Sequence, residues 1–225
     1  MKKDTKLQKV SNEILGIIKK NQFNPAQVRY IFKLVRQKGG YQVPKVPKAL
    51  PNYLSPAEIY QLLQVTEDSF DHLLIEFLLK TGLRISEARN IMIQDIDFSM
   101  QQINVRKGKN SKDRTVTLHH SLVNTLRMYI NDRKGYLFVK KDGLRYSVRA
   151  LQYRISKNIE KLGSSKKLNT HSLRHTFATY LRLQGMPLQD IQVILGHSTI
   201  KTTEIYAKMV QSVESREKFQ QIMGF

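Results

Sequence analysis

The segment HSLRHTFATY, residues 171–180, gathers cationic and titratable side chains on one predicted helix. Its apolar residues recur every four positions and form a stripe that can face a core: Leu173, Phe177, Leu181. His171 and Arg174 lie on another face, which we expect to be available for chemistry. An isolated HxxR pair is more typical of an amphipathic helix with a solvated basic side, so the rest of the chain has to decide between these two interpretations.

Three further segments carry residues of the same chemical kinds. TGLRISE places Arg84 just past a predicted helix end, and KGKNSKDR places Lys109 at a predicted turn. LGHSTIKTTEIYAK contains His197 and Tyr206. Each has an ordinary structural explanation when taken singly: Arg84 could pair with Glu87, Lys109 could be a solvated turn lysine, His197 could cap the helix that follows, and Tyr206 could lie at a domain edge.

The composition indicates a polyanionic partner. The chain has 225 residues, with 38 Lys and Arg against 18 Asp and Glu, a formal charge of +20 and a pI near 10.1. Such a balance favours nucleic acid binding. No apolar run approaches the length that spans a bilayer, the amino terminus lacks the apolar region of a secretory signal, and there are no cysteines. We therefore expect a cytoplasmic protein, located at the nucleoid when it is bound to DNA.

Charge is distributed unevenly along the chain. Residues 2–48 hold twelve basic and two acidic residues, whereas residues 55–100 hold three basic and eight acidic ones. The balance reverses in residues 105–115, with five basic and one acidic, and in residues 133–167, with eleven basic and two acidic. This alternation predicts one basic face and one acidic or neutral face.

The chain divides into four predicted parts. Residues 1–40 read as a short segment of two helices, and residues 41–54 as a basic Pro/Gly linker that is either a spacer or a strap touching DNA. The main domain, 55–208, begins at SPAE, where Ser55 can cap a helix and Glu58 can close a capping box. Residues 209–225 can form a helical tail.

The main domain is predicted to be mostly α with a small antiparallel sheet (α+β). QQINVR and RTVTL alternate and read as a hairpin joined by a basic turn, and YLFV at 136–139 is a candidate third strand. The helices are predicted to reach about residue 65, to end at Gly82 and before Gly163, Gly185 and Gly196, and to include residues 120–131 and a final stretch from 199 onward.

Together these motifs resemble the tyrosine site-specific recombinase family, which includes the phage integrases. The resemblance runs from Ser55 to Lys208 through TGLRISEARNI, GKNSKDRTVTL, HSLRHTFATYL and LGHSTIKTTEIYA. An HxxR pair followed by LGH and a tyrosine nine residues later is the most specific part. The resemblance implies a tyrosine-recombinase catalytic domain that cleaves and rejoins DNA through a 3′-phosphotyrosyl intermediate, in order to integrate, excise or invert a segment.

The resemblance also implies a role for each matching residue. Tyr206 would be the nucleophile, and Arg84 and Arg174 would bind the nonbridging phosphate oxygens, a task that suits guanidinium forks. Lys109 would protonate the departing 5′-oxygen, His171 would accept or relay the phenolic proton, and His197 would hydrogen-bond a phosphate oxygen. No metal or other cofactor is implied. His175 receives no chemical role, and Glu87 is expected to hold Arg84.

The chain departs from the family pattern at its amino end. Many members place a four-helix DNA-clamping domain before the catalytic one, whereas here the first 54 residues have room for two helices. Either this is a naturally short recombinase, or residues 1–40 form a reduced clamp helped by the linker. Site preference should then rest on phosphate contacts from residues 133–167.

The resemblance further implies partners and two alternatives. The tail would dock on a neighbouring protomer in a dimer or tetramer on double-stranded DNA, or else pack on its own domain, and an accessory DNA-bending or directionality protein could take part. A type IB topoisomerase-like enzyme would use the same residues to relax one duplex. A DNA-binding regulator would keep the fold without strand exchange, but it would have little reason to keep Tyr206 and both arginines.

Overall fold

The computed structural model describes the backbone of residues 5–40, 50–106 and 113–223, and side chains as far as residue 213. Lys109 lies outside the described residues. The chain forms two compact units, Met1–Lys48 and Ala49–Phe225. None of the helices described is long and apolar enough to cross a membrane.

The first unit is a pair of helices, as predicted. Helix α1 spans Thr5–Lys20 and α2 spans Pro25–Lys38. Asn24 starts α2 with a reciprocal capping box, because its side chain accepts from the Gln27 N–H while the Gln27 side chain accepts from the Asn24 N–H. Several large apolar side chains on both helices are exposed, so this pair buries little of its own apolar surface.

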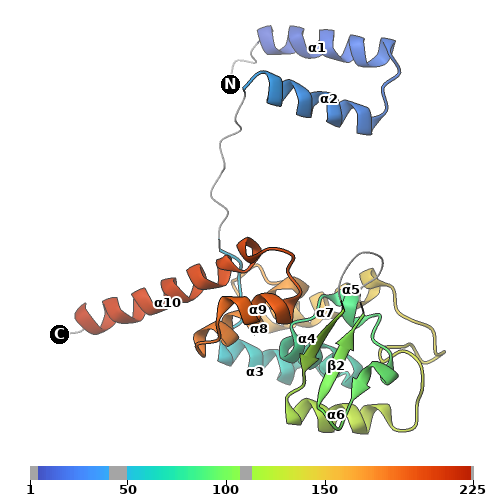
Figure 1. Cartoon of the computed structure of the whole chain (residues 1–225), viewed down its shortest axis with the longest axis vertical. Coiled ribbons are helices and arrows are strands. Elements are labelled where there is room, and N and C mark those ends of the chain that lie inside the picture. Colours follow the sequence, from blue (N-terminus) through green and yellow to red (C-terminus); the bar gives the residue numbers. More distant parts are fainter. Residues whose placement is uncertain (1–4, 41–49, 107–112, 224–225) are drawn as a thin grey trace. The chain divides into compact units, whose positions relative to one another are not determined.

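The second unit is mostly helical, and its elements begin and end where local signals predict (Figure 1). Ser55 and Glu58 form the predicted capping box, and Gly82, Gly163 and Gly196 end their helices in the left-handed conformation. The helices are α3 (Pro56–Val65), α4 (Ser69–Thr81), α5 (Ile85–Ala88), α6 (His120–Ile130), α7 (Val148–Leu162), α8 (Thr170–Leu183), α9 (Leu188–Leu195) and α10 (Glu204–Met223), with short 3-10 turns η1 (Ile93–Asp95) and η2 (Ile200–Thr202).

The sheet is antiparallel, in the order β1 (Ile96–Asp97), β2 (Gln102–Val105), β3 (Arg114–Thr117). The β2–β3 hairpin is confirmed, with Val105 opposite Arg114. The third strand was predicted wrongly: residues 136–139 make only isolated bridges, and β1 takes that place. Leu137 and Phe138 are both fully buried, and such consecutive burial suits a core-filling segment rather than a strand that alternates between core and solvent.

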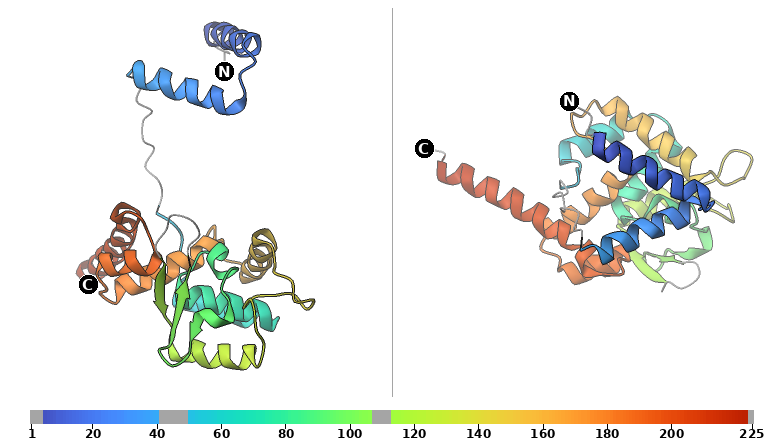
Figure 2. Two further views of the ribbon diagram at one scale, coloured as in Figure 1. Left: turned by 45° about the vertical axis from the view of Figure 1, so that its right-hand side comes forward. Right: turned by 90° about the horizontal axis from the view of Figure 1, so that it is seen from above.

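Helix α8 packs against α4, α9 and α10. Helix α9 also contacts β3, and it stands beside the green strands in Figures 1 and 2. The side chain of Arg174 is buried between these elements, so the alternative of a solvated basic side does not hold at this position. The chain also joins the second unit before Ser55, since Leu54 is fully buried and its N–H donates to Thr176 Oγ1 at 2.9 Å.

Gly82 and Gly163 provide a matched test of how closely α8 approaches the end of α4. Both have left-handed backbones, with φ of +63° and +64°, so alanine strains either by about 1–2 kcal/mol. At Gly82 the added Cβ would also lie 2.2 Å from Phe177 Cδ1, whereas nothing lies within 4 Å at Gly163. We expect Gly82→Ala to lower the free energy of unfolding by about 1–3 kcal/mol more than Gly163→Ala in urea denaturation. Equal losses would contradict this packing.

Candidate active site

The end of α4 positions Arg84. After the left-handed Gly82 the chain turns into the short α5, with Arg84 at its N-cap. The Glu87 side chain accepts the Arg84 backbone N–H at 2.8 Å and Arg84 Nη1 at 2.9 Å. Glu87 thus holds both the backbone and the guanidinium of Arg84, whose side chain remains 37% exposed.

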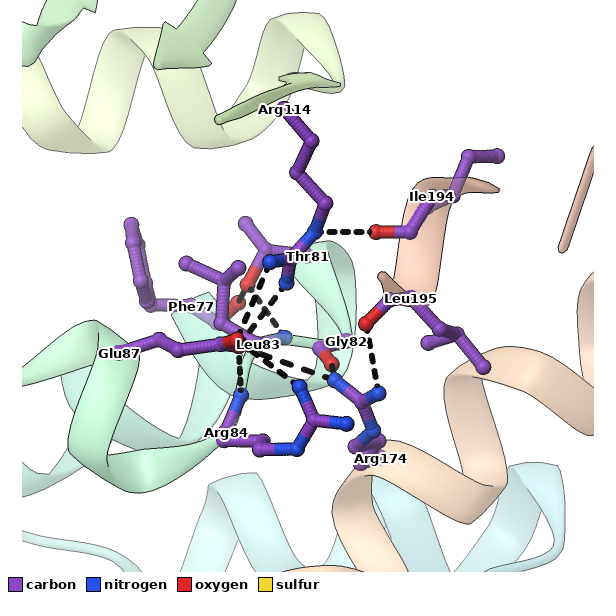
Figure 3. A network of polar contacts seen from close by, with 10 residues as sticks. All are labelled: Phe77, Thr81, Gly82, Leu83, Arg84, Glu87, Arg114, Arg174, Ile194 and Leu195. Atoms are coloured by element: carbon purple, nitrogen blue, oxygen red, sulfur yellow. Dashed lines mark hydrogen bonds and ion pairs between the residues drawn. The ribbon is translucent and has the colours of Figure 1, made fainter. Parts of the chain in front are cut away.

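Arg174 reaches the same place from the middle of α8 (Figure 3). Its Nη1 donates to the Gly82 carbonyl at 2.7 Å and its Nη2 to the Leu195 carbonyl at 2.8 Å, so it joins the ends of α4 and α9. Nη1 also lies 3.8 Å from Glu87 Oε2. Burial, and then the charge of Arg84, lowers the pKa of Arg174 to about 10, which leaves the group cationic at neutral pH.

A third arginine, Arg114, binds the same carboxylate. From the start of β3 its Nη1 and Nη2 donate to the two Glu87 oxygens at 3.1 and 2.9 Å. Burial would raise the pKa of Glu87, but the Arg114 hydrogen bonds and the Arg84 backbone N–H outweigh it and lower this pKa to about 2. Three guanidinium groups therefore surround one ionised carboxylate and leave an excess of positive charge that can receive an anion.

His197 and Tyr206 lie near enough to Arg174 for its charge to influence the pKa of each. His197 follows the left-handed Gly196 at the end of α9, and its Nδ1 is 3.0 Å from Thr203 Oγ1. Its ring is nearly parallel to that of Tyr206, with 6.5 Å between centroids. Burial, and then the charges of Arg174 and Arg84, lowers the pKa of His197 to about 4, so the ring is neutral at pH 7.

Tyr206 is enclosed in the first turn of α10. Only 1% of it is exposed, and it belongs to an apolar cluster with Ala178 and Met209. Its hydroxyl lies 3.2 Å from Nδ1 of His175, whose pKa is lowered to about 4 chiefly by burial. Burial raises the pKa of Tyr206, although the charges of Arg174 and Arg84 oppose this.

The predicted site residues are thus brought together to different degrees. Arg84, Arg174, His197 and Tyr206 converge from four segments, whereas His171 is exposed on the first turn of α8. The structure adds Arg114 and His175, to which the sequence analysis assigned no chemistry. Arg114 could have been noticed, because it occupies an inward-facing position in the alternating strand RTVTL, where a charged residue needs a buried partner.

This fold and this arrangement of arginines, histidines and a tyrosine define a tyrosine recombinase catalytic unit. The chain belongs to the phage integrase family, whose model matches residues 52–212. It is 33% identical to the tyrosine recombinase XerA of Pyrococcus horikoshii, over 80% of this chain and 67% of that protein. It is 32% identical to XerC of Bacillus subtilis, over 73% of this chain and 59% of that protein.

Solved structures agree with this assignment. The crystal structure of a XerA recombinase matches with a TM-score of 0.67 at 30% identity, over 95% of this chain and 82% of that one. A XerH site-specific recombinase bound to its difH substrate in a pre-cleavage complex matches with a TM-score of 0.62 at 27% identity, over 74% of this chain and 53% of that one. Because Ala49–Phe225 makes up less than four fifths of the chain, the XerA match extends into the first unit.

The shared carboxylate predicts a pH dependence of stability. The pKa of Glu87 is about 2 in the fold, below its ordinary 4.5. The ionised form therefore stabilises the fold above pH 4.5, and this contribution, roughly 3 kcal/mol at most, is lost as the pH falls toward 2. Between those values the free energy of unfolding, measured by denaturant titration, should decline more steeply for the wild type than for Glu87→Gln. Parallel curves would contradict this role.

Proposed function

We propose that this protein is a site-specific DNA recombinase that integrates, excises or inverts a DNA segment by cutting and rejoining strands. The observation that carries this proposal is the cluster of Arg84, Arg174 and Glu87 beside Tyr206. An excess of fixed positive charge next to a phenol suits a reaction in which a phosphodiester gains negative charge while tyrosine attacks it. The chain spans about two thirds or less of its XerA and XerC relatives, so the activity is proposed for the chain as it stands.

In the proposed reaction Tyr206 attacks the scissile phosphorus. A bond forms between the phenolic oxygen and phosphorus while the bond from phosphorus to the 5′-oxygen breaks, which leaves a 3′-phosphotyrosyl link and a free 5′-hydroxyl. Arg84 and Arg174 bind the nonbridging oxygens, and His197 donates a hydrogen bond to one of them. Lys109 protonates the 5′-oxygen. Rejoining reverses these steps with a different strand and conserves the bond energy in the ester.

Proton removal from Tyr206 requires the phenol to move. In its enclosed position the hydroxyl contacts His175 and has a raised pKa, so both access and ionisation are unfavourable there. We propose that binding of the scissile phosphate draws the phenol out of its apolar surroundings and toward the guanidinium groups. The exposed His171 then accepts or relays the proton, while His175 holds the resting hydroxyl.

We propose double-stranded DNA as the substrate, bound in part by the outer face of α7. Arg149, Tyr153, Lys157 and Lys161 are four residues apart on this helix and are all exposed. A row of basic residues with one aromatic side chain suits a phosphate backbone.

We further propose that the protein acts as a dimer or tetramer on DNA, with residues 209–225 docking on a neighbouring protomer. Residues 209–223 continue the helix that carries Tyr206, so docking would bear directly on the proposed nucleophile.

The first test is covalent capture on a suicide DNA substrate. The duplex carries a nick near the crossover, so that the fragment released by cleavage diffuses away and the protein stays attached. Candidate sites come from the DNA that flanks the protein's own gene. We expect a protein–DNA adduct that resists denaturation, forms in the presence of a chelator, and is abolished by Tyr206→Phe. Tight binding of the same DNA without any adduct would favour a DNA-binding regulator instead.

The basic face predicts a strong salt dependence of DNA binding. If 6 to 10 phosphates are contacted, affinity should fall by about 10³- to 10⁵-fold between 50 and 200 mM salt. In a fluorescence anisotropy titration, the double variant Arg149→Gln/Lys157→Gln should reduce the magnitude of the slope of log affinity against log salt by about 2. Lys80→Gln is the matched control, because Lys80 is paired with Glu76 at 2.6 Å. A shallow wild-type slope, or equal changes in both variants, would count against this face.

A further inference from the structure

We propose that Arg114 is a positioning residue of the recombinase site, which fixes Glu87 and, through Glu87, the phosphate-binding groups of Arg84 and Arg174. This inference rests on the proposed function and adds a member to its machinery. Arg114 does not belong to the six residues predicted for the chemistry, and it approaches the site from the sheet rather than from the helices (Figure 3).

Arg114 donates hydrogen bonds from all three nitrogens of its guanidinium group. Nη1 and Nη2 each donate to one Glu87 oxygen, at 3.1 and 2.9 Å, which is the bidentate geometry that fixes a carboxylate in orientation as well as in position. Nε donates to the Ile194 carbonyl at 2.8 Å. The side chain is only 6% exposed, so these bonds are shielded from water.

Glu87 passes this constraint to the two predicted phosphate-binding arginines. Glu87 Oε1 accepts hydrogen bonds from Nη1 of Arg114 and from Nη1 of Arg84. Glu87 Oε2 accepts from Arg114 Nη2 and from the backbone N–H of Arg84, and it lies 3.8 Å from Nη1 of Arg174. A carboxylate released from Arg114 could rotate about its terminal bond and carry Arg84 with it. Arg114 is also the leading group that keeps this buried carboxylate ionised, since its hydrogen bond is the largest influence lowering the pKa of Glu87.

The second anchor ties the same assembly to α9. Arg114 binds the carbonyl of Ile194, and Arg174 binds that of Leu195, the next residue. These two carbonyls end the helix that leads into Gly196 and His197. Arg114 and Arg174 therefore hold the end of α9 and the Glu87 carboxylate at once, from β3 and α8. Four elements, α5, β3, α8 and α9, are thereby held together at this point.

The hairpin offers a matched control for Arg114. Arg106 follows Val105, the residue paired with Arg114 across the hairpin, and it too binds a buried carboxylate, Asp95, at 2.8 Å. Its side chain is 64% exposed, and its ion pair is with Asp95 rather than with Glu87. A general effect of weakening the hairpin should appear in Arg106→Lys, whereas an effect transmitted through Glu87 should appear only in Arg114→Lys.

The experiment compares the rate of covalent adduct formation on two suicide substrates, one with an ordinary scissile phosphate and one with a neutral methylphosphonate at that position. The methylphosphonate lacks the charge that the guanidinium groups have to stabilise, so misplacing them matters less. We expect Arg114→Lys, which keeps the charge but loses the fork, to slow cleavage of the phosphodiester by about 10- to 100-fold. On the methylphosphonate most of that loss should disappear, and Arg106→Lys should change neither rate by more than about 2-fold.

Equal losses on both substrates, or no loss on either, would overturn the inference. Wild type and Tyr206→Phe run in parallel, so that failure of the proposed function appears separately, as a wild type that forms no Tyr206-dependent adduct. A second readout needs no DNA: the steep decline of stability between pH 4.5 and 2 should flatten in Arg114→Gln as it does in Glu87→Gln. A decline as steep as that of the wild type would likewise overturn it.

Discussion

The Glu87 carboxylate is the interaction on which the candidate site depends. Burying several guanidinium groups together is unfavourable unless an anion compensates for their lost hydration and mutual repulsion. Among the residues described, Glu87 provides that anion for Arg84, Arg114 and Arg174. It neutralises only part of their charge. In the proposed reaction a bound phosphodiester would supply the remaining negative charge, which grows as the reaction proceeds.

Carbonyl groups at two helix ends also stabilise the buried guanidinium of Arg174. Its guanidinium binds the carbonyl that follows α4 and the last carbonyl of α9, where the helix dipoles concentrate negative potential. Gly82 has two roles in this arrangement, since its left-handed backbone ends α4 and its lack of a Cβ lets Phe177 of α8 approach. The close approach of α8 to α4 is what brings Arg174 within reach of the Arg84 segment.

The sequence predicts those features that local physics decides. Capping residues and left-handed glycines mark helix ends without help from distant segments, so Ser55, Gly82 and Gly196 were placed correctly. Some features that depend on distant packing could not be predicted. The periodicity of α8 reveals one apolar stripe but not the second packing surface that buries Arg174. The pair of Arg114 with Glu87 joins residues 27 positions apart, and nothing local to either one specifies its partner.

The position of Tyr206 sets an energetic condition on the proposed reaction. The phenol is surrounded by apolar side chains and shares its helix with Met209 and Val210, which are also buried, so exposing it disrupts packing beyond a single ring. The resting state is thereby protected from unproductive ionisation. A substrate can drive the change only by as much as it binds the rearranged state more tightly. We propose that contacts made only by the displaced phenol, to the bound phosphate and to the guanidinium groups, supply this preference. The net positive charge that Glu87 leaves on the three arginines would then favour movement of the proposed nucleophile once DNA is bound.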